Sequence, residues 1–288
     1  MTKRFIPPKR KQFNQINLSR STKQILLGSL LGDGSLKIAK NYKNARFCEK
    51  HSTVQLEYLD WKFSQLEPEL KGRIIISEPT SSSFSKKKKV LYQSRVSNEL
   101  TILHHLTHTR NKKTIKRSWL NNLDALGLAT WWCDDGSLNV ATQQGVICTD
   151  CFTRAEHLIL ARYLEIDWKI HCKIIDRPIK NKNKALIRTD YRLRFSNIKE
   201  FKAFLRIILP HIPVASMIYK VMICFKDPQD QQRWISEVKN ALPQFESEIS
   251  TIYEIPFQRY GDLVEKNRKL TFRDIFYKTP KFVSILKG

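Results

Sequence analysis

Two aspartates stand directly before a glycine at the end of an apolar run, Asp33 in the first half of the chain and Asp135 in the second. A single Asp-Gly pair usually marks a turn, but these two lie 102 residues apart and each separates an apolar segment from an alternating one. If two helices ending at these acids pack together, their carboxylates, with ordinary pKa values of about 4, repel unless cations lie between them. Divalent cations bind carboxylate oxygens and neutralise the attacking and leaving oxygens in phosphodiester hydrolysis. The spacing therefore predicts a metal site built on these two acids.

The two apolar runs must form the helices that carry these acids. Ser21 and Gln24 have the spacing of a capping box, which predicts that a helix begins just before the first run. Glycine inside a helix costs about 1 kcal/mol relative to alanine. Gly28 and Gly32, one turn apart, therefore indicate a face that another helix approaches closely. The alternative, a membrane helix dimer, needs about 20 apolar residues, and this run is far shorter.

Each acid is followed by the same predicted order of elements. Alternation of apolar and polar residues begins directly after each Asp-Gly pair, which is typical of a strand. Capping boxes at Ser52 with Gln55 and at Thr153 with Glu156 predict the next helix in each half. The complete pattern is helix-strand-strand-helix-strand-strand-helix, used twice. It predicts an α+β fold of two pseudo-symmetric units with antiparallel sheets.

The repeat divides the chain into four predicted parts. The first unit covers residues 21–117 and the second covers residues 118–226. Residues 1–20 are basic and contain prolines, which is typical of a disordered arm, and contact with phosphates or a targeting role are the alternatives. Residues 227–288 lie beyond the repeat, and the sequence assigns them no role.

The charge of the chain indicates a polyanionic partner. The 288 residues include 51 basic and 27 acidic ones, for a net charge of +24 spread along the whole chain. Such a charge favours nucleic acid, whereas no strongly basic amphipathic helix, signal peptide or membrane segment is evident. The six cysteines lack the spacing of a disulfide framework. We therefore expect an intracellular protein without membrane contact, in a mitochondrion, a chloroplast or a bacterial cytoplasm.

The double motif resembles that of the LAGLIDADG homing endonucleases, in the single-chain form that carries both motifs. The resemblance implies that the two motif helices pack at the centre of a pseudo-dimer, with their acids side by side. It also implies Mg²⁺ or Mn²⁺ as cofactor, held by Asp33 and Asp135 together with their neighbours Gly32 and Asp134. The chain also departs from the motif at Ser29, Leu31, Thr130, Trp131 and Trp132. We expect these departures, and the one at Asp134, to concern helix packing.

Two lysines follow the closing helices of the two units at corresponding places. Lys113 lies in a Lys-Lys-Thr-Ile context and Lys220 in a Tyr-Lys context, 107 residues apart. By resemblance to related endonucleases, both are expected to be catalytic, stabilising phosphate charge or positioning the attacking water. The alternative is that they are ordinary surface lysines.

Sequence readout is expected from the exposed faces of the strands, because a curved antiparallel sheet fits the major groove of DNA. Each candidate could equally be a solvated side chain. Lys87 and Lys88, in a run of four lysines, are expected to meet phosphates. The candidates for base contacts are Lys37, Arg46, Gln93, Arg95, Asn139, Arg188, Arg192 and Arg194.

These features favour a monomeric, sequence-specific, metal-dependent homing endonuclease. Such a hydrolase makes a double-strand break in a long DNA target, with one active site per strand, and serves intron homing. One alternative is a maturase that binds intron RNA and assists splicing, and another is a catalytically silent DNA-binding regulator. Both motif acids are intact, which favours the endonuclease. The single CxxC at Cys148 and Cys151 has no partner pair, so no zinc site is expected.

Overall fold

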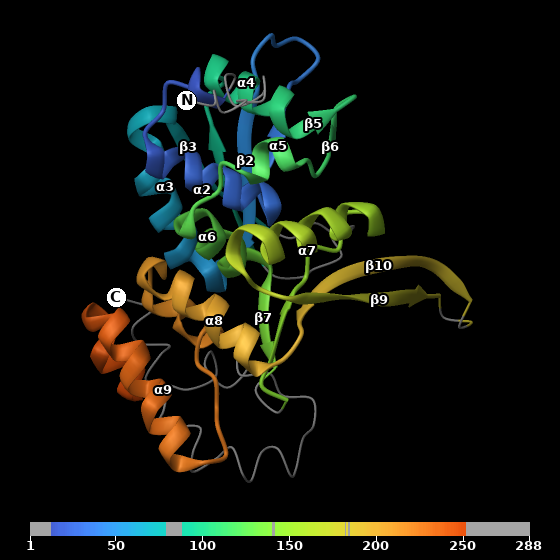
Figure 1. Cartoon of the computed structure of the whole chain (residues 1–288). Helices are drawn as coiled ribbons and strands as arrows, with labels where there is room; N and C mark the ends of the chain where they lie inside the picture. Colours follow the sequence, from blue (N-terminus) through green and yellow to red (C-terminus); the bar gives the residue numbers. More distant parts are fainter. Residues whose placement is uncertain (1–12, 79–87, 140–141, 182, 184, 252–288) are drawn as a thin grey trace, which may run out of the picture.

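The computed structural model describes residues 13–78, 88–139, 142–181, 183 and 185–251, and two similar units follow each other along the chain (Figure 1). Each unit contains a four-stranded antiparallel sheet, with strand order β1-β2-β4-β3 in the first and β7-β8-β10-β9 in the second. The two orders are equivalent, position by position. The predicted α+β fold of two pseudo-symmetric units is therefore confirmed.

The elements follow the predicted order in both halves. The first unit contains α2 (Arg20–Leu31), β1 (Ser35–Lys37), β2 (Arg46–Ser52), α3 (Leu56–Leu70), β3 (Gly72–Ser77), β4 (Lys89–Ser94) and α4 (Asn98–Thr107). The second contains α6 (Ala125–Asp135), β7 (Gly136–Asn139), β8 (Gln144–Ile147), α7 (Arg154–Trp168), β9 (Cys172–Lys180), β10 (Leu186–Phe195) and α8 (Ile198–Ile208). The short hairpin β5 (His108–Thr109) and β6 (Lys112–Lys113) and the helix α5 (Arg117–Leu120) connect them.

The motif helices α2 and α6 pack side by side at the centre of the molecule, as predicted (Figure 1). Glycine makes the close approach possible. A Cβ atom on Gly28 would lie 2.3 Å from the carbonyl oxygen of Gly127 and 2.6 Å from Cβ of Thr130. Backbone therefore meets backbone at this crossing, and no larger residue fits at Gly28 without moving the helices apart.

We expect Gly28→Ala to lower the free energy of unfolding, although alanine favours helices. The new methyl group would overlap the backbone of Gly127, and overpacking of this kind costs about 1–3 kcal/mol. Urea unfolding of the metal-free protein measures the change, with Ser236→Ala on an exposed helix surface as the control. Equal stability of the Gly28 variant and the wild type would contradict the close crossing.

The start of α2 differs from the prediction. Ser19, and not Ser21, is the N-cap, and its hydroxyl accepts a hydrogen bond from the backbone N–H of Thr22 at 3.2 Å. Gln24 turns toward the second unit, where its amide donates to the carbonyl of Asn122 at 2.7 Å and accepts from the N–H of Asp124 at 2.7 Å. The side chain of Gln24 therefore joins the beginnings of the two motif helices.

The other two capping boxes had different outcomes. Thr153 and Glu156 form the predicted box at the start of α7. Ser52 makes no capping hydrogen bond, because a 3₁₀ turn over Thr53–Gln55 precedes α3. As a result, α3 begins at Leu56, whose side chain is exposed.

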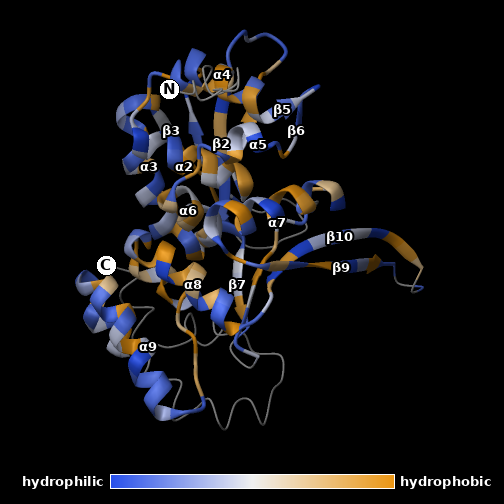
Figure 2. Ribbon diagram, viewed as in Figure 1, coloured by the Kyte–Doolittle hydropathy of each residue, from blue (hydrophilic) through white to orange (hydrophobic). Residues whose placement is uncertain are grey.

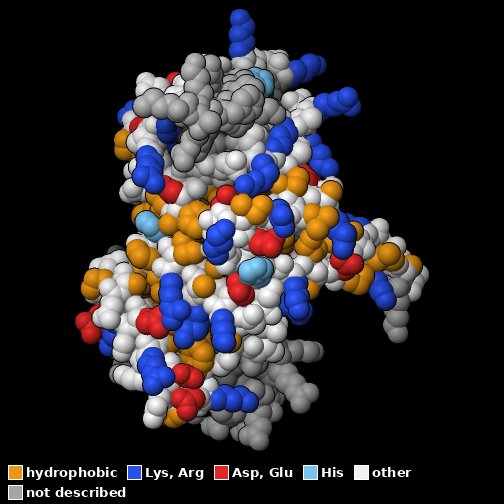
Figure 3. Space-filling model, viewed as in Figure 1, with side chains coloured by type: hydrophobic (Ala, Val, Ile, Leu, Met, Phe, Trp, Pro, Cys, Tyr) orange, Lys and Arg blue, Asp and Glu red, His pale blue; other side chains and the backbone are white. Residues whose placement is uncertain are grey.

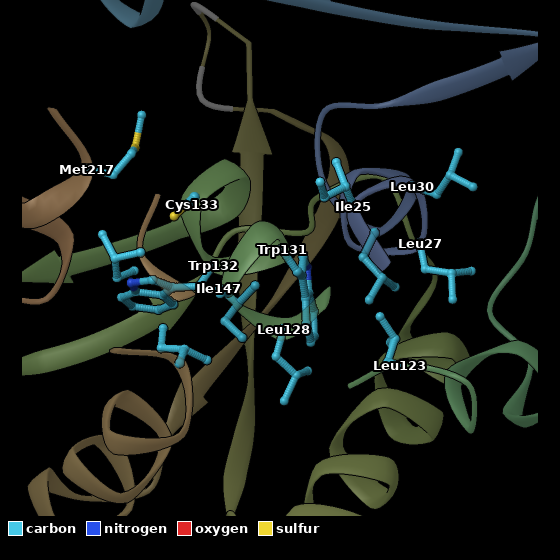
Figure 4. Packing of buried hydrophobic residues seen from close by; sticks show 14 of the residues in the cluster. Ile25, Leu27, Leu30, Leu123, Leu128, Trp131, Trp132, Cys133, Ile147 and Met217 are labelled. Atoms are coloured by element: carbon cyan, nitrogen blue, oxygen red, sulfur yellow. The ribbon is translucent and has the colours of Figure 1, made fainter. Parts of the chain in front are cut away.

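Two adjacent tryptophans of α6 anchor the second unit to the central helices. Figure 4 shows their indoles on different sides of α6, with Trp132 toward Ile147 and Met217 and Trp131 toward the residues of α2. The Trp132 ring packs against Phe195, Phe201 and Phe204, with centroids 5.3–6.0 Å away. Both tryptophans are fully buried. They depart from the motif because α6 must fill the core of its own unit as well as contact α2.

Most side chains on the core face of the sheets are apolar, and the outer faces carry polar side chains. In the first sheet Leu36 and Phe47 point into the core, whereas Ser35 and Lys37 share the opposite face. Figure 2 shows the same mixture of apolar and hydrophilic residues along the helices, as burial of one side requires. The strand that follows each motif acid therefore presents polar side chains on the outer face of its sheet.

The helix α9 (Pro228–Ala241) packs on the second unit. The Trp234 indole donates to the carbonyl of Val221 at 3.1 Å, and Glu237 binds Arg206 of α8 at 2.7 Å. This contact accounts for part of the chain beyond the repeat. Within the part that the structure describes, no helix combines the length and the apolar character that a membrane span requires.

Candidate active site

The two motif acids meet where α2 and α6 end. Gly32 is the C-cap of α2 and Asp33 follows it, whereas Asp135 is the last residue of α6. The Asp33 side chain is 43% exposed. Burial, and then the nearby carboxylates of Asp33 and Asp134, raise the pKa of Asp135 well above its usual value. The close helix crossing therefore brings three carboxyl groups together, the arrangement that a cation would relieve.

Asp134 reaches from the second unit into the first. Its buried carboxylate accepts hydrogen bonds from Lys62 Nζ at 2.7 Å, the Tyr58 hydroxyl at 2.9 Å and the backbone N–H of Asp33 at 3.3 Å. A Cβ atom on Gly32 would lie 2.4 Å from Cβ of Asp134. The glycine before the first acid therefore makes room for the carboxylate before the second.

A buried ionic network connects Asp134 to β2. The Lys62 ammonium binds Asp134, Glu49 and, at 2.8 Å, the hydroxyl of Ser29, and its side chain is fully buried. Burial lowers the pKa of Lys62, but Asp134 and Glu49 more than offset this and raise it to about 12. We expected the departures from the motif at Ser29 and Asp134 to concern helix packing. Both side chains also bind the buried ammonium group of Lys62.

The network brings His51 to the first motif acid. Nε2 of His51 lies 2.7 Å from Glu49 Oε1, and Nδ1 lies 3.6 Å from Asp33 Oδ2. Burial raises the pKa of Glu49, but Lys62 and His51 bring it down to about 2. Asp33, His51 and Asp134 each offer a ligand atom, all within 4.8 Å of one another. This group is placed where a metal ion could bind.

We expect Lys62→Met to lower the free energy of unfolding by about 3–5 kcal/mol at pH 7, because it removes the buried ammonium group that Glu49 and Asp134 share. In the variant both carboxyls must have raised pKa values in the folded state. The deficit should then be largest above pH 7 and should shrink toward pH 5, where protons neutralise them. Urea unfolding over this pH range measures it.

The matched control is Lys71→Met, which removes an exposed lysine that lies 3.8 Å from Glu67. Exposed pairs of this kind contribute about 0–1 kcal/mol. A loss for Lys62→Met that equals the control, or that does not depend on pH, would contradict the description of the network.

The two predicted lysines occupy equivalent positions at the ends of the motif helices. Lys113 on β6 donates to the carbonyl of Gly34 at 3.1 Å and approaches that of Gly32 at 3.5 Å. Lys220 donates to the carbonyls of Cys133 and, at 3.2 Å, Asp134. Both ammonium groups oppose the rise in the pKa of Asp135. Each lysine therefore lies at the negative end of a motif helix, beside the acids.

Burial distinguishes the two lysines from ordinary surface charges. Lys220 is 5% exposed, and burial lowers its pKa, although the acids around it oppose the shift. The side chain of Lys113 is half-buried and lies over the ring of Phe152, 5.5 Å from its centroid. The structure thus places all four residues predicted to be catalytic around one centre, and their catalytic roles stay predictions.

An open groove of ≈ 650 Å³ runs over the outer face of the first sheet, and Asp33 is one of its lining residues. The predicted base-contacting residues Lys37, Arg46 and Gln93 line the same groove. Lys37 and Arg46 pair directly across β1 and β2. Figure 3 shows Lys and Arg side chains over both units on the face in view. A groove lined by Lys37 and Arg46 attracts a polyanion and would bring it beside the carboxylate of Asp33.

In the second unit, Asn139, Arg188, Arg192 and Arg194 share the outer face of the sheet, as predicted. Asp150 binds Arg192 through two hydrogen bonds of 2.6 and 2.7 Å. Arg188 binds Asp190 in the same way, at 2.8 and 3.4 Å. These carboxylates hold the guanidinium groups in fixed directions over the sheet.

The remaining predicted DNA contacts lie at the margin of the first sheet. Arg95 is exposed just after β4, and Lys88 pairs with Glu78 at 2.6 Å. Lys87 lies outside the described residues. The structure therefore brings Arg95 and Lys88 to the surface but assigns neither to the groove.

Glu49, His51, Tyr58 and Lys62 were not predicted, although the sequence carried a signal for some of them. Glu49 and His51 alternate with Phe47 on the inward face of β2. Lys62 lies between Leu59 and Leu66 on the apolar stripe of α3. Charged residues at core positions need partners, and such positions indicate a buried network even without a structure.

Comparisons with known proteins agree with this geometry. Residues 23–201 match the model of the LAGLIDADG DNA endonuclease family. The DNA endonuclease I-ChuI of Chlamydomonas applanata is 24% identical over 223 residues, 72% of this chain and 96% of that protein. The structure of the homing endonuclease I-WcaI bound to its DNA recognition sequence has 21% identity and a TM-score of 0.59, and the match covers 76% of this chain and 96% of that one.

Parts of longer proteins also match. The protein RecA of Mycobacterium gastri is 29% identical over 161 residues, 51% of this chain and 36% of that protein. The RecA of Mycolicibacterium flavescens is 27% identical over 222 residues, 73% of this chain and 48% of that protein. The chain thus spans less than half the length of these two proteins. The family match extends over more than half of the chain and includes both motif helices, so the chain belongs to the LAGLIDADG DNA endonuclease family.

Proposed function

We propose that the protein is a sequence-specific, divalent-metal-dependent homing endonuclease that cuts both strands of a long DNA target. The observation that supports this most strongly is the pairing of Asp33 and Asp135 at adjacent helix ends, each with a lysine that donates to backbone carbonyls at or just beyond the end of its helix. Two equivalent sets of acid and lysine fit one active site per strand. The family match supports the same reaction.

The acids fit Mg²⁺ or Mn²⁺ as the cofactor. Asp33 and Asp134 offer carboxylate oxygens within 4.8 Å of each other, and Asp135 ends the neighbouring helix. Burial, and then the carboxylates of Asp33 and Asp134, raise the pKa of Asp135, so a bound cation would favour its ionised form. When bound, the ion supplies charge neutralisation at the attacking and leaving oxygens. The acids fix its position because the ends of two packed helices hold them in direction.

The two lysines would act on the phosphate that is cut. Lys113 and Lys220 are held by backbone carbonyls, so their ammonium groups need little reorganisation when negative charge develops nearby. Because each lysine is supplied by its own unit, each can serve one strand. Their proposed role is to stabilise the charge on the phosphate or to position the attacking water.

We expect the affinity for DNA to fall linearly with salt on logarithmic axes, with a slope of several units. The net charge of +24 and the basic groove beside Asp33 are the reasons. Fluorescence anisotropy with a labelled duplex at several KCl concentrations measures the slope. A nearly flat line would contradict the assignment of the groove to phosphate contacts.

Cleavage itself is tested with a plasmid that carries the uninterrupted form of the gene flanking the coding sequence. The proposal predicts a linear product with Mg²⁺ or Mn²⁺ and intact plasmid with EDTA. A protein that leaves every such plasmid intact but assists RNA splicing would instead be a maturase. Tight DNA binding with neither activity would identify a silent regulator.

A further inference from the structure

The two halves of the paired site differ in the strand that faces each acid. Ser35, two residues after Asp33, pairs with Cys48 in β2. Ser137, two residues after Asp135, pairs with Val146 in β8. Aligning the strands on these residues, Ile147 takes the place of Glu49 and Thr149 that of His51. At this strand position an imidazole lies beside Asp33 and a threonine takes its place in the second unit, so the surroundings of the two motif acids differ chemically.

His51 is oriented as a metal ligand would be. Its side chain is 1% exposed, and its Nε2 atom lies 2.7 Å from the buried Oε1 atom of Glu49. Nδ1 makes no hydrogen bond and faces Asp33 Oδ2 at 3.6 Å. With the proton on Nε2, a lone pair on Nδ1 points at a carboxylate. A carboxylate that accepts from the far nitrogen commonly orients metal-binding histidines.

The charges in contact with His51 and its partners favour a cation. Asp33, Asp134 and Glu49 bring three negative charges when ionised, and Lys62 returns one positive charge. This network is therefore negative before the more distant groups of the site are counted. Oε2 of Glu49 is buried without a hydrogen-bond partner, which adds to the negative potential there.

The distances also suit a shared ion. Donor atoms of Asp33, His51 and Asp134 lie within 4.8 Å of one another. Ligands about 2.0–2.2 Å from one ion are at most about 4.4 Å apart. Closing the site around an ion thus needs only a small movement, and the exposed Asp33 side chain can make it.

We infer that His51 is a nitrogen ligand in the metal site of the first unit, oriented by Glu49. This inference rests on the proposed function and deepens it. An imidazole among carboxylates favours first-row transition ions over Mg²⁺ and Ca²⁺, with Mn²⁺ the least favoured of them and Co²⁺, Ni²⁺ and Zn²⁺ more strongly favoured. Beside Asp135 the corresponding strand position carries Thr149, so it supplies no imidazole. The two strands of the DNA target should therefore be cut with different metal preferences.

Pulsed EPR of the full chain loaded with Mn²⁺, without DNA, tests the ligand directly. We expect coupling of the ion to a ¹⁴N nucleus, replaced by ¹⁵N coupling when the protein is labelled with ¹⁵N-histidine. His51→Gln and Asp33→Ala should both abolish the coupling. His171→Gln, which removes an exposed histidine between Glu165 and Glu200, should retain it. Absence of coupling in the wild type, or its persistence in either site variant, overturns the inference.

Affinity provides a second readout. Titration calorimetry of His51→Gln should show at least about tenfold weaker binding of Mn²⁺, whereas binding of Ca²⁺ should change by less than about threefold. Equal losses for both ions would contradict a nitrogen ligand. Because Asp33 is exposed and the wild type needs no substitution, the EPR test stands even if His51→Gln folds poorly.

Failure of this inference differs from failure of the proposed function. A protein that cuts DNA but shows no nitrogen coupling would retain its function and lose the His51 ligand. A protein with nitrogen coupling that leaves every DNA target uncut would retain the ligand and lose the endonuclease.

Discussion

Asp33→Asn and Asp135→Asn are each expected to abolish the linear product of plasmid cleavage, with a loss of rate of about 10³-fold or more. A metal at a phosphodiester contributes several kcal/mol of charge stabilisation, and about 4 kcal/mol corresponds to that factor. The amide keeps the size of the acid but loses its charge. Single-turnover cleavage at saturating protein measures the loss separately from DNA binding.

Two measurements serve as controls for the acid variants. DNA affinity should remain within about threefold of the wild type, because phosphate contacts on the basic faces dominate it. Thermal stability without metal should not fall for Asp135→Asn, because burial and two neighbouring acids raise the pKa of the wild-type carboxyl. Cleavage at the full rate by either variant would remove that acid from the mechanism.

Lys113→Met and Lys220→Met should slow single-turnover cleavage by on the order of 10²-fold each. Both ammonium groups lie at the helix ends that carry the acids and are held there by backbone carbonyls. The effect should appear in the rate at saturating protein and not in the affinity. A kinetic loss without a binding loss separates charge stabilisation from simple attraction of DNA.

Lys50→Met is the matched control for the lysines, because Lys50 is exposed and lines the groove beside Asp33. It should weaken binding, lower the salt slope by about one unit and leave the cleavage rate near normal. Equal, small effects of all three substitutions would show that Lys113 and Lys220 are ordinary basic residues.

The architecture could be predicted because local patterns and the repeat agree. The alternation of apolar and polar residues after Asp33 and Asp135 predicted the order of elements. The glycines of α2 predicted the close helix crossing. The start of α2 was less predictable. The side chain of Gln24 forms hydrogen bonds with Asn122 and Asp124 of the second unit, and Ser19 caps the helix. Contacts between residues so far apart in the chain leave no pattern in the local sequence.

The ionic network shows why the site was only partly predictable. Lys62 and Glu49 are buried through contacts between α3, β2 and the last turn of α6, which are distant in sequence. Alone, each looks like an error in an apolar pattern. Their burial is explained only in the folded structure, where Asp134 of the second unit pairs with Lys62. A buried charge is tolerated when it is paired and hydrogen-bonded.

We propose that one chain carries two active sites, one for each strand. The most direct test uses a target duplex with a different label on each strand, mixed with equimolar protein, and combines mass photometry of the complex with mapping of both cuts. We expect one chain per duplex and a cut on each strand in Mg²⁺ or Mn²⁺. A complex of two chains, or cleavage of one strand alone by the wild type, would contradict it.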